Sequence, residues 1–569
     1  MIKRKLTLFL IFFLLILSLP SVKPFINRGF FPMHDDTQPA RVYEMAKALS
    51  YGQFPVRWVP DLGYGYGYPL FNYYAPLPYY AGAIFSLSGL DAIISAKIMF
   101  VIGIILAGIT MLLLVNYLAN PSAGIASSLL YLYAPYHAVN IYVRGAVGEI
   151  YAYGFMPLYI LGLVMIINKT KKDVRNGIIL SSIGLAGIIL SHNILGMITG
   201  YFTLAFMIPY LIYLIIKKSK LTVFFVLTLA LFMGVGLSAF FALPAIAEKD
   251  YSNVSKIISG GSDYYLHFVT LTQLWDSSWG FAGSAPGVED GMSFRIGKLH
   301  VIFASISIIL LVFFYYWKRI PRLNLRTKQP VKGLYPILVI MFFISIFLMI
   351  EQSSYIWKNL PGFSFIQYPW RFLNFTVLYA SILISVLFLA LKKNHQLYLC
   401  LLILLLVLGS YPNLFTPQAI RSVKLEDYVS YDNLRNKISK ISDEYLPANF
   451  VTPNPPNDLF SIDPTNPEVQ IKTLHDTPTQ KSYILNSKRS IDFYPNITYF
   501  PSWRATLDDT VITINNYQGK IGLVIPEGQH SLILSFVNTQ IQLLSNFISL
   551  SSLILLVYVS LFWKAKIYV

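Results

Sequence analysis

The chain has 569 residues, of which 55% are hydrophobic and only 12% are charged, whereas a typical soluble domain carries about 25% charged residues. A single cysteine, Cys400, excludes an internal disulfide and a cysteine-based metal site. The formal net charge of +17 would suggest a nucleic-acid partner in a soluble protein, but basic residues also mark the cytoplasmic loops of membrane proteins. We therefore expect a membrane protein that binds no nucleic acid.

The N-terminus reads Lys3-Arg4-Lys5 and continues as an apolar run from Leu6 to Leu19. A secretory signal peptide begins in the same way, but Ser18-Leu-Pro-Ser-Val lacks a clear small-x-small cleavage site. We expect an uncleaved first membrane helix that starts in the cytoplasm.

Residues 24–93 are expected to form the first outer loop. The apolar residues within 37–49 recur at helical spacing, which predicts a short helix there, capped by Asp36 or Thr37. Asp35 has no such structural role. A carboxylate near the membrane and beside aromatic walls could have a raised pKa and act as a base, or could bind a divalent cation or a sugar hydroxyl.

The same loop contains the run Gly63-Tyr-Gly65-Tyr-Gly67-Tyr-Pro69. The run lacks the preceding strand and the following helix that phosphate-binding loops require. Two interpretations stay open: an interfacial loop with tyrosine rings at headgroup level, or a wall that faces a sugar or a lipid.

Apolar runs long enough to cross the membrane recur after this loop. With the first helix they predict about twelve spans, the others near 94–117, 121–137, 149–168, 176–191, 193–216, 221–245, 298–317, 333–350, 371–391, 395–411 and 541–562. Cytoplasmic loops are enriched in Lys and Arg. Basic clusters fall in alternate connections, as this count requires, at 169–175, 217–220, 318–332, 392–393 and 564–566. The alternation predicts that both termini are cytoplasmic.

The remaining connections are then outside, at 138–148, 191–193, 246–297, 351–370 and 412–540. The last of these ends in β-branched, partly alternating runs at 510–514 and 520–525. Turn signals lie at Asp508-Asp509, Asn515-Asn516 and 526–528. We predict an extracytoplasmic β-rich domain over 412–540, as a small antiparallel sheet or sandwich, followed by a final helix and a short tail over 541–569.

Several charged residues fall on the outer side. Arg144 can grip a phosphate through two parallel hydrogen bonds, whereas Glu149 begins a helix and has a favourable dipole interaction there. His192 lies in an outer turn, and Arg371 opens a helix, where it could meet a lipid phosphate or extend to the interface. No nucleotide-binding motif is present, so any group transfer would take a substrate delivered within the membrane.

The membrane part resembles the family called 6-pyruvoyl-tetrahydropterin synthase-related. The resemblance rests on Phe54-Pro-Val-Arg57-Trp58, Tyr131-Leu-Tyr-Ala-Pro-Tyr-His137, Arg144-Gly-Ala, Ser191-His-Asn, Leu243-Pro-Ala-Ile-Ala-Glu248-Lys and Pro361-Gly-Phe-Ser-Phe-Ile-Gln-Tyr-Pro-Trp-Arg371. The soluble synthase of that name binds zinc through clustered histidines, which this chain lacks, so we reject that chemistry.

The family is in turn similar to the GT-C-type glycosyltransferases, which take sugars from polyprenyl-phosphate carriers at the outer face of the membrane. In these enzymes the first outer loop holds an acidic catalytic residue soon after the first helix, a placement that Asp35 and Asp36 match. The stretches 499–505 and 525–530 resemble outer domains of bacterial membrane proteins thought to act in polymer glycosylation.

The resemblance implies a polytopic α-helical, GT-C-like domain over 1–411 in the plasma membrane and an inverting glycosyltransferase of the cell envelope. The enzyme would move a sugar from a polyprenyl-phosphate donor to an extracytoplasmic glycan or protein. Asp35 or Asp36 would deprotonate the acceptor hydroxyl, and Arg144 or Arg371 would hold the leaving phosphate. The substrate site would further include His34, Arg41, Arg57, Glu149 and His192.

A divalent metal is compatible with this chemistry, but nothing in the sequence requires one. Two alternatives are a non-enzymatic transporter or flippase of lipid-linked glycans and a membrane scaffold that displays the C-terminal domain. Transporters place polar groups near the bilayer midplane, and the predicted spans contain few ionisable residues, which counts against the first alternative.

Overall fold

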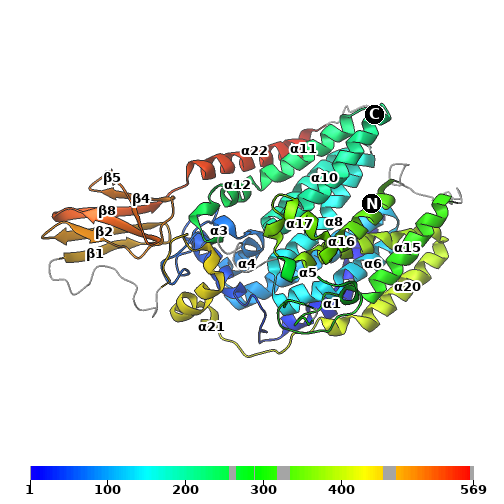
Figure 1. The fold of residues 1–569 in the computed structure, drawn as a ribbon, viewed down its shortest axis with the longest axis horizontal. Helices are drawn as coiled ribbons and strands as arrows, with labels where there is room; N and C mark the ends of the chain where they lie inside the picture. Colours follow the sequence, from blue (N-terminus) through cyan, green and yellow to red (C-terminus); the bar gives the residue numbers. More distant parts are fainter. Residues whose placement is uncertain are drawn as a thin grey trace.

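The computed structural model describes residues 2–168, 170–254, 264–287, 289–316, 333–452 and 469–563. These residues form a helical bundle with a β domain on one side, and the N and C marks lie on the opposite side of the bundle (Figure 1). We call the side that carries the β domain the domain side. The predicted basic clusters at 318–332 and 564–566, and Lys169, lie outside the described residues.

Eight helical stretches of the described chain are long and apolar enough to cross a membrane. They are α1 (Ile2–Ile26), α5 (Ala92–Leu118), α8 (Val147–Asn168), α9 (Lys171–Ser191), α10 (Asn193–Ile216), the run from η7 (Pro369–Phe372) through α18 (Leu373–Leu383) to α19 (Ser385–Ala390), α20 (Lys393–Ser410) and α22 (Gln540–Phe562). This confirms a polytopic α-helical membrane protein.

Two further stretches are bent pairs of helices. α11 (Thr222–Leu237) meets α12 (Ala239–Ala247) at 71°, and α16 (Leu334–Phe347) meets the segment Glu351–Asn359, which contains α17 (Ser354–Asn359), at 100°. Counting each pair as one span gives ten, and α15 (Lys298–Tyr316) is a shorter apolar helix. The predicted number of about twelve spans is therefore not confirmed.

The predicted span at 121–137 is broken. α6 (Pro121–Leu132) is followed by α7 (Pro135–Ala138) and by the π-helical turn η1 (Val139–Arg144). Pro135 has no backbone N–H to donate and disfavours helical backbone angles at the residue before it. Ala134 accordingly has an extended ψ of 136°. The break turns the chain so that Arg144 lies at the domain side, close to the start of α8.

The first loop folds back on the bundle as α2 (Gln38–Ser50), α3 (Leu70–Tyr73) and α4 (Leu77–Leu87). The short helix predicted at 37–49 is confirmed by α2. Thr37, one of the two predicted caps, occupies the N-cap position but makes no side-chain capping bond, and Asp36 instead accepts a hydrogen bond from the Tyr428 hydroxyl at 2.9 Å.

The glycine–tyrosine run of the same loop faces neither headgroups nor an open wall. Tyr64, Tyr66 and Tyr68 are all buried. Gly67 has φ of +69°, and a Cβ there would overlap the indole of Trp58. The Gly67 carbonyl accepts a hydrogen bond from Thr498 of the β domain at 2.6 Å. Both open interpretations of this run are wrong, because the run is a packed support for the C-terminal part of the chain.

The β domain is a sandwich of antiparallel sheets, which confirms the predicted β-rich C-terminal domain. One sheet has the order β1 (Val469–Asp476), β2 (Gln480–Ser487), β8 (Gly528–Phe536), β4 (Trp503–Leu507), β5 (Thr510–Ile512), and the other has the order β3 (Ile491–Phe493), β7 (Lys520–Ile525), β6 (Asn515–Tyr517). Buried side chains of both sheets, such as Leu485, Trp503 and Leu523, form one core. The turn predicted at Asn515-Asn516 is wrong.

The stretch 412–452 contains short helical turns, including α21 (Glu426–Val429) and η10 (Ser439–Tyr445), and its packing partner is the first loop. The rings of Tyr445 and Tyr73 stack with centroids 6.3 Å apart. Among the described residues of the predicted 412–540 unit, the strands lie at 469–536, and 412–452 packs against the first loop.

Candidate functional site

Backbone pairing places Asp35 beside Arg144. The His34 N–H donates to the Val143 carbonyl at 2.9 Å, and the Asp35 N–H donates to the Arg144 carbonyl at 3.0 Å. Gly145 follows with φ of +65°, and a Cβ at this position would overlap Met33. The first loop and the turn after η1 thus form a short extended contact that fixes both side chains on the domain side.

Glu149, fully buried at the start of α8, is the centre of a polar cluster. Its Oε1 accepts hydrogen bonds from Arg144 Nη1 at 2.8 Å and from Arg371 Nε at 3.3 Å. Its Oε2 accepts one from Asn374 Nδ2 at 3.0 Å, and His192 Nε2 lies 3.8 Å from Oε1. Residues from three separate connections therefore meet at one carboxylate, which we call the Glu149 cluster.

The guanidinium of Arg144 lies over an aromatic ring. Its guanidinium carbon lies 4.7 Å from the ring centre of Trp370, a geometry typical of a cation–π contact. Burial disfavours the charged form, but the nearby carboxylate of Glu149 outweighs it and raises the pKa of Arg144. The hydrogen bonds of Arg144 to Tyr136, Asn140 and Glu149 all use Nη1, and its other amino group takes no part in them.

His192 lies between α9 and α10 and is neutral near pH 7. Burial lowers its pKa to about 3, in spite of the opposing charge of Glu149. Its Nδ1 accepts the backbone N–H of Leu195 at 3.2 Å, so the ring proton is on Nε2 and is directed to the Glu149 cluster.

Asp35 is partly exposed and ionised. Burial disfavours the charged form, but the hydrogen bond from His34 Nδ1 at 2.8 Å and the charge of Arg144 outweigh it and lower the pKa of Asp35. The raised pKa expected for this carboxylate is therefore wrong. Because His34 uses Oδ1, Oδ2 is the oxygen available to a substrate hydroxyl.

Gln38 joins the first loop to the Arg144 turn, a role that no pattern in the sequence indicated. Its Nε2 donates to the Asp35 carbonyl at 3.2 Å and to the Gly145 carbonyl at 3.0 Å. Its Oε1 accepts the Tyr79 hydroxyl at 2.7 Å. Because both polar atoms of this buried amide are hydrogen-bonded, Gln38 fixes the spacing between the first loop and the Arg144 turn.

Arg41 of α2 lies beside Tyr74 and Tyr79. Its guanidinium carbon is 4.2 Å from the ring centre of Tyr74, and its Nη1 donates to the Tyr79 hydroxyl at 3.3 Å. The charge of Arg41 acts on both Asp35 and the half-buried Glu444 of η10. Glu444 is a second acidic residue of this region that the sequence did not indicate, because only the fold brings η10 to the first loop.

Two of the predicted site residues lie elsewhere. Arg57 is buried, and its guanidinium donates hydrogen bonds to Asn72 at 3.0 Å, to the Phe240 carbonyl at 2.9 Å and to Asn546 at 3.1 Å. None of these partners belongs to the Glu149 cluster. The Asp36 side chain turns to Tyr428, and burial raises its pKa despite that bond. In the described chain, the side chains of Arg57 and Asp36 link segments that are distant in sequence, and neither contacts the pair formed by Asp35 and Arg144.

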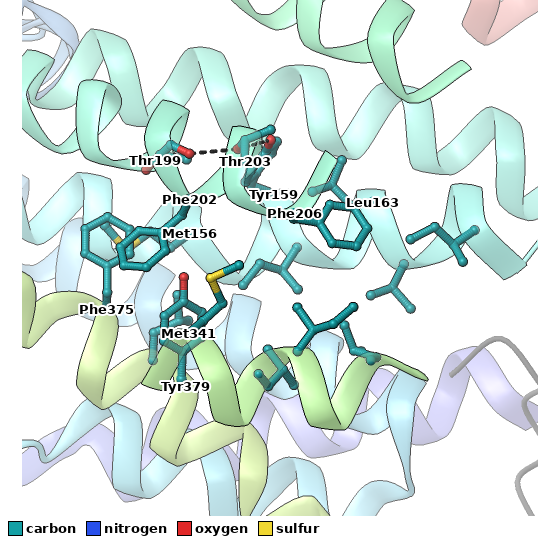
Figure 2. A pocket seen from close by; sticks show the side chains of 17 residues that line it. Met156, Tyr159, Leu163, Thr199, Phe202, Thr203, Phe206, Met341, Phe375 and Tyr379 are labelled. Carbon is teal, nitrogen blue, oxygen red and sulfur yellow. Dashed lines mark hydrogen bonds between the residues drawn. The ribbon is translucent and has the colours of Figure 1, made fainter. Parts of the chain in front are cut away.

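An apolar cavity lies further along the same helices (Figure 2). The empty space in and around it is about 670 Å³, which includes space open to the surroundings, and it lies between α8, α10, α16 and α18. Met156 lines it seven residues after Glu149, which is about 10 Å along α8. Phe202 and Phe375 lie at one end of the cavity, and Leu163 and Phe206 lie nearer the other (Figure 2). The polar cluster and the apolar cavity therefore share α8 and α18, and His192 directly precedes α10.

The side chains described here do not fit a metal centre. Within the described residues, no three His, Cys, Asp or Glu side chains are grouped closely enough to hold a metal ion. We derive no step of a reaction through a metal.

Residues 71–276 match the family model described as the 6-pyruvoyl-tetrahydropterin synthase related domain, a membrane protein. The match confirms that resemblance over this stretch. An uncharacterized protein of Lactococcus lactis subsp. cremoris strain MG1363 is 26% identical over 243 residues, which cover 41% of this chain and 38% of the relative.

Solved structures with a similar arrangement are named as glycosyltransferases, the class that the resemblance implies. The oligosaccharyltransferase of Archaeoglobus fulgidus in the apo form has a TM-score of 0.47 and 14% identity, covering 80% of this chain and 61% of that one. The arabinofuranosyltransferase AftD from Mycobacteria has a TM-score of 0.45 and 13% identity, covering 74% and 28%. The chain thus spans about three fifths of the first and under a third of the second, and likeness at this level assigns no activity.

Proposed function

We propose that this protein is a membrane glycosyltransferase that moves a sugar from a polyprenyl-phosphate donor to an acceptor hydroxyl at the domain side of the membrane. The observation that carries the proposal is the contact between Asp35 and Arg144, which lies next to the Glu149 cluster. The ionised carboxylate of Asp35 lies beside Arg144, and Arg144 shares Glu149 with Arg371, as a base and a leaving phosphate would require.

In the proposed reaction the acceptor hydroxyl approaches Asp35. Its oxygen attacks the anomeric carbon of the sugar while its proton passes to Oδ2 of Asp35. The bond between that carbon and the phosphate oxygen breaks, and the bonding electrons leave with the polyprenyl phosphate. Arg144 and Arg371 stabilise the negative charge of the leaving phosphate. A single displacement of this kind inverts the configuration at the anomeric carbon.

The cavity supports a lipid-linked donor over a soluble one. Its lining is apolar apart from Tyr159, Thr199, Thr203 and Tyr379, and the Thr203 hydroxyl donates to the carbonyl of Thr199 within α10. A phosphate held at the Glu149 cluster would have its apolar chain within about 10 Å of this space. We also propose that the domain side is extracytoplasmic, with both termini in the cytoplasm.

The test is sugar transfer by the purified full chain in lipid nanodiscs, with polyprenyl-phosphate sugars as donors and mixed extracytoplasmic glycans as acceptors. Asp35→Asn is expected to reduce the rate at least about 100-fold, within the range for loss of a general base. Asp36→Asn is the matched control, since the neighbouring carboxylate is bonded to Tyr428, and it should retain most of the rate.

Full activity of the Asp35→Asn protein would overturn the assignment of the base. Movement of the lipid-linked sugar across the membrane of sealed vesicles, with no covalent product, would instead establish a flippase. Addition and chelation of Mg²⁺ and Mn²⁺ in the transfer assay tests for a divalent metal, and an activity that depends on either ion would contradict a reaction carried by side chains alone.

A further inference from the structure

The segment that follows α16 carries a layer of buried aromatic rings. It bends 100° away from α16 and continues through α17 to Arg371. The rings of Trp357, Phe363 and Phe372 are each at most 2% exposed. Their centroids are 5.3 Å apart for Trp357 and Phe363, and 6.0 Å apart for Trp357 and Phe372. We call these three rings the aromatic cap.

The aromatic cap closes the end of the cavity that is nearest to the Glu149 cluster. The Phe372 ring lies 6.1 Å from Phe202 and 6.3 Å from Phe375, and both of these rings line the cavity. Phe202 and Phe375 mark one end of the cavity in Figure 2. The cap is fastened to α10, because the Tyr201 hydroxyl donates to the Pro361 carbonyl. The cap therefore packs directly against this end of the cavity.

The backbone beside the cap is strained. Gln367 has φ of +63° and ψ of −45°, and the Tyr368 N–H donates to the Ile366 carbonyl at 2.7 Å. This is a three-residue turn with a positive central φ, a rare and strained conformation for a residue with a side chain. Such a turn persists only when its surroundings hold it in place.

Arg371 holds this turn and belongs to the Glu149 cluster as well. Its Nη1 donates to the Ile366 carbonyl at 2.6 Å and to Gln367 Oε1 at 3.3 Å, while its Nε donates to Glu149. A phosphate oxygen is a stronger acceptor for a guanidinium than a neutral carbonyl or amide oxygen. A phosphate bound at the cluster would therefore compete with the turn for Nη1.

We infer that the cavity is a binding site for the apolar chain of a lipid phosphate, and that the aromatic cap opens to admit this chain when the phosphate takes Arg371 from the strained turn at Gln367. The inference rests on the lipid-phosphate donor of the proposed function, but it does not depend on sugar transfer. Coupling of this kind would admit a chain only when its headgroup is already bound.

Hydrogen exchange of the full chain in nanodiscs tests the cap directly. Undecaprenyl phosphate should speed exchange of the amides in 361–371 at least about tenfold, and inorganic phosphate at high concentration should act in the same direction. Undecaprenol, which has the chain without the phosphate, should have no effect. Arg371→Lys should speed exchange of these amides without any ligand, because an ammonium cannot hold both acceptors of the turn and Glu149 together. Slow exchange in the Arg371→Lys protein would overturn the inference.

A large side chain placed in the cavity distinguishes binding of the lipid's apolar chain from binding of its phosphate headgroup. Leu163→Trp places an indole in the lining and should weaken undecaprenyl phosphate binding at least about tenfold, while inorganic phosphate still opens the cap. Leu405→Trp on the exposed face of α20 is the matched control and should change neither. Unchanged lipid binding by the Leu163→Trp protein would overturn the chain site.

The two proposals can fail separately. If undecaprenyl phosphate binds and opens the cap but no sugar is transferred from any donor, the proposed function fails and the inference stands. If sugar is transferred while exchange of 361–371 does not respond to the lipid, the inference fails and the proposed function stands.

Discussion

Glu149 is the residue on which the polar cluster depends, since it is the shared acceptor of two arginines. Glu149→Gln keeps the size of the side chain but removes its charge, so the buried Arg371 and the half-buried Arg144 would lose the carboxylate that they share. Breaking a buried ion pair on one side costs about 3–5 kcal/mol. We expect a loss of folding free energy of this order, measured as a decrease in the thermal unfolding temperature in nanodiscs.

A double-mutant cycle separates this loss from a general effect of substitution. Arg144→Gln in the Glu149→Gln background removes one of the uncompensated charges and should recover part of the stability. Purely additive losses in the two single variants and the double variant would contradict a coupled cluster.

His192 makes folding depend on pH. In the unfolded chain the imidazole has a pKa near 6.5, and burial lowers it to about 3 in the folded protein. Between these values the unfolded state binds more protons, so the free energy of unfolding decreases, and the protein becomes less stable, as the pH falls from about 6.5 toward 3. At pH 5 this single group would account for up to about 2 kcal/mol.

The measurement compares the wild type with His192→Gln in thermal unfolding between pH 7.5 and 5. His34 opposes the effect, because its bond to Asp35 raises its pKa and so stabilises the fold as the pH falls. The difference between the two proteins isolates His192. A wild-type curve that runs parallel to that of the variant would show that the imidazole is not buried in neutral form.

At the scale of the elements, the close contact between the start of α8 and the end of α9 sets the position of His192. A Cβ at Gly148 would lie 2.5 Å from the Ser191 carbonyl oxygen, so this close approach requires glycine. Gly148→Ala should push the two helices apart, destabilise the protein by about 1–3 kcal/mol and lower lipid-phosphate binding.

Gly200 on α10 is the matched control, since nothing lies within 4 Å of the position that its Cβ would occupy. Alanine in a helix interior is favoured over glycine by roughly 0.5–1 kcal/mol. Gly200→Ala should therefore stabilise the protein slightly in the same thermal assay. Equal effects of the two substitutions would mean that helix propensity, and not packing, decides the result.

Elements with a strong local pattern could be predicted from the sequence. Helix α2 and the strands β5 and β7 follow from periodicity within a few residues. The break after α6 was not predicted, although Pro135 is its cause, because the apolar run continues through it. The reversal at Gln518-Gly519 was missed because the preceding pair Asn515-Asn516 is the more common turn signal, yet these asparagines begin β6.

The candidate site was predictable only in part. Charge alternation along the chain placed Arg144, Glu149 and His192 on one side of the membrane, and the fold brings them together. Asn374 and Gln38 carry no sequence signal of their own. Arg57 lies apart from the Glu149 cluster and bonds Asn546, which is 489 positions further along the chain, and no local pattern links the two.

At the scale of the whole molecule, one buried carboxylate joins the helical bundle to the β domain. Glu248, at the end of α12, accepts hydrogen bonds from Asn72 of the first loop at 2.8 Å, from Thr539 at the N-cap of α22 at 2.5 Å and from Gln542 of α22 at 3.0 Å. Gln542 also bonds Ser502, directly before β4. The carboxylate therefore connects the loop that carries Asp35 with the segment that carries the sandwich.

Glu248→Ala should loosen this joint without unfolding the sandwich, because the sandwich has a buried core of its own. We expect faster hydrogen exchange in 70–73 and in the first turn of α22, with unchanged exchange in β2 and β8. Glu351→Ala, at an exposed position, is the control and should change neither region. Since Asp35 belongs to the same loop as Asn72, the proposed transfer should also slow in the Glu248→Ala protein. Faster exchange in β2 and β8 together with 70–73 would show that the domain and the bundle unfold as one unit.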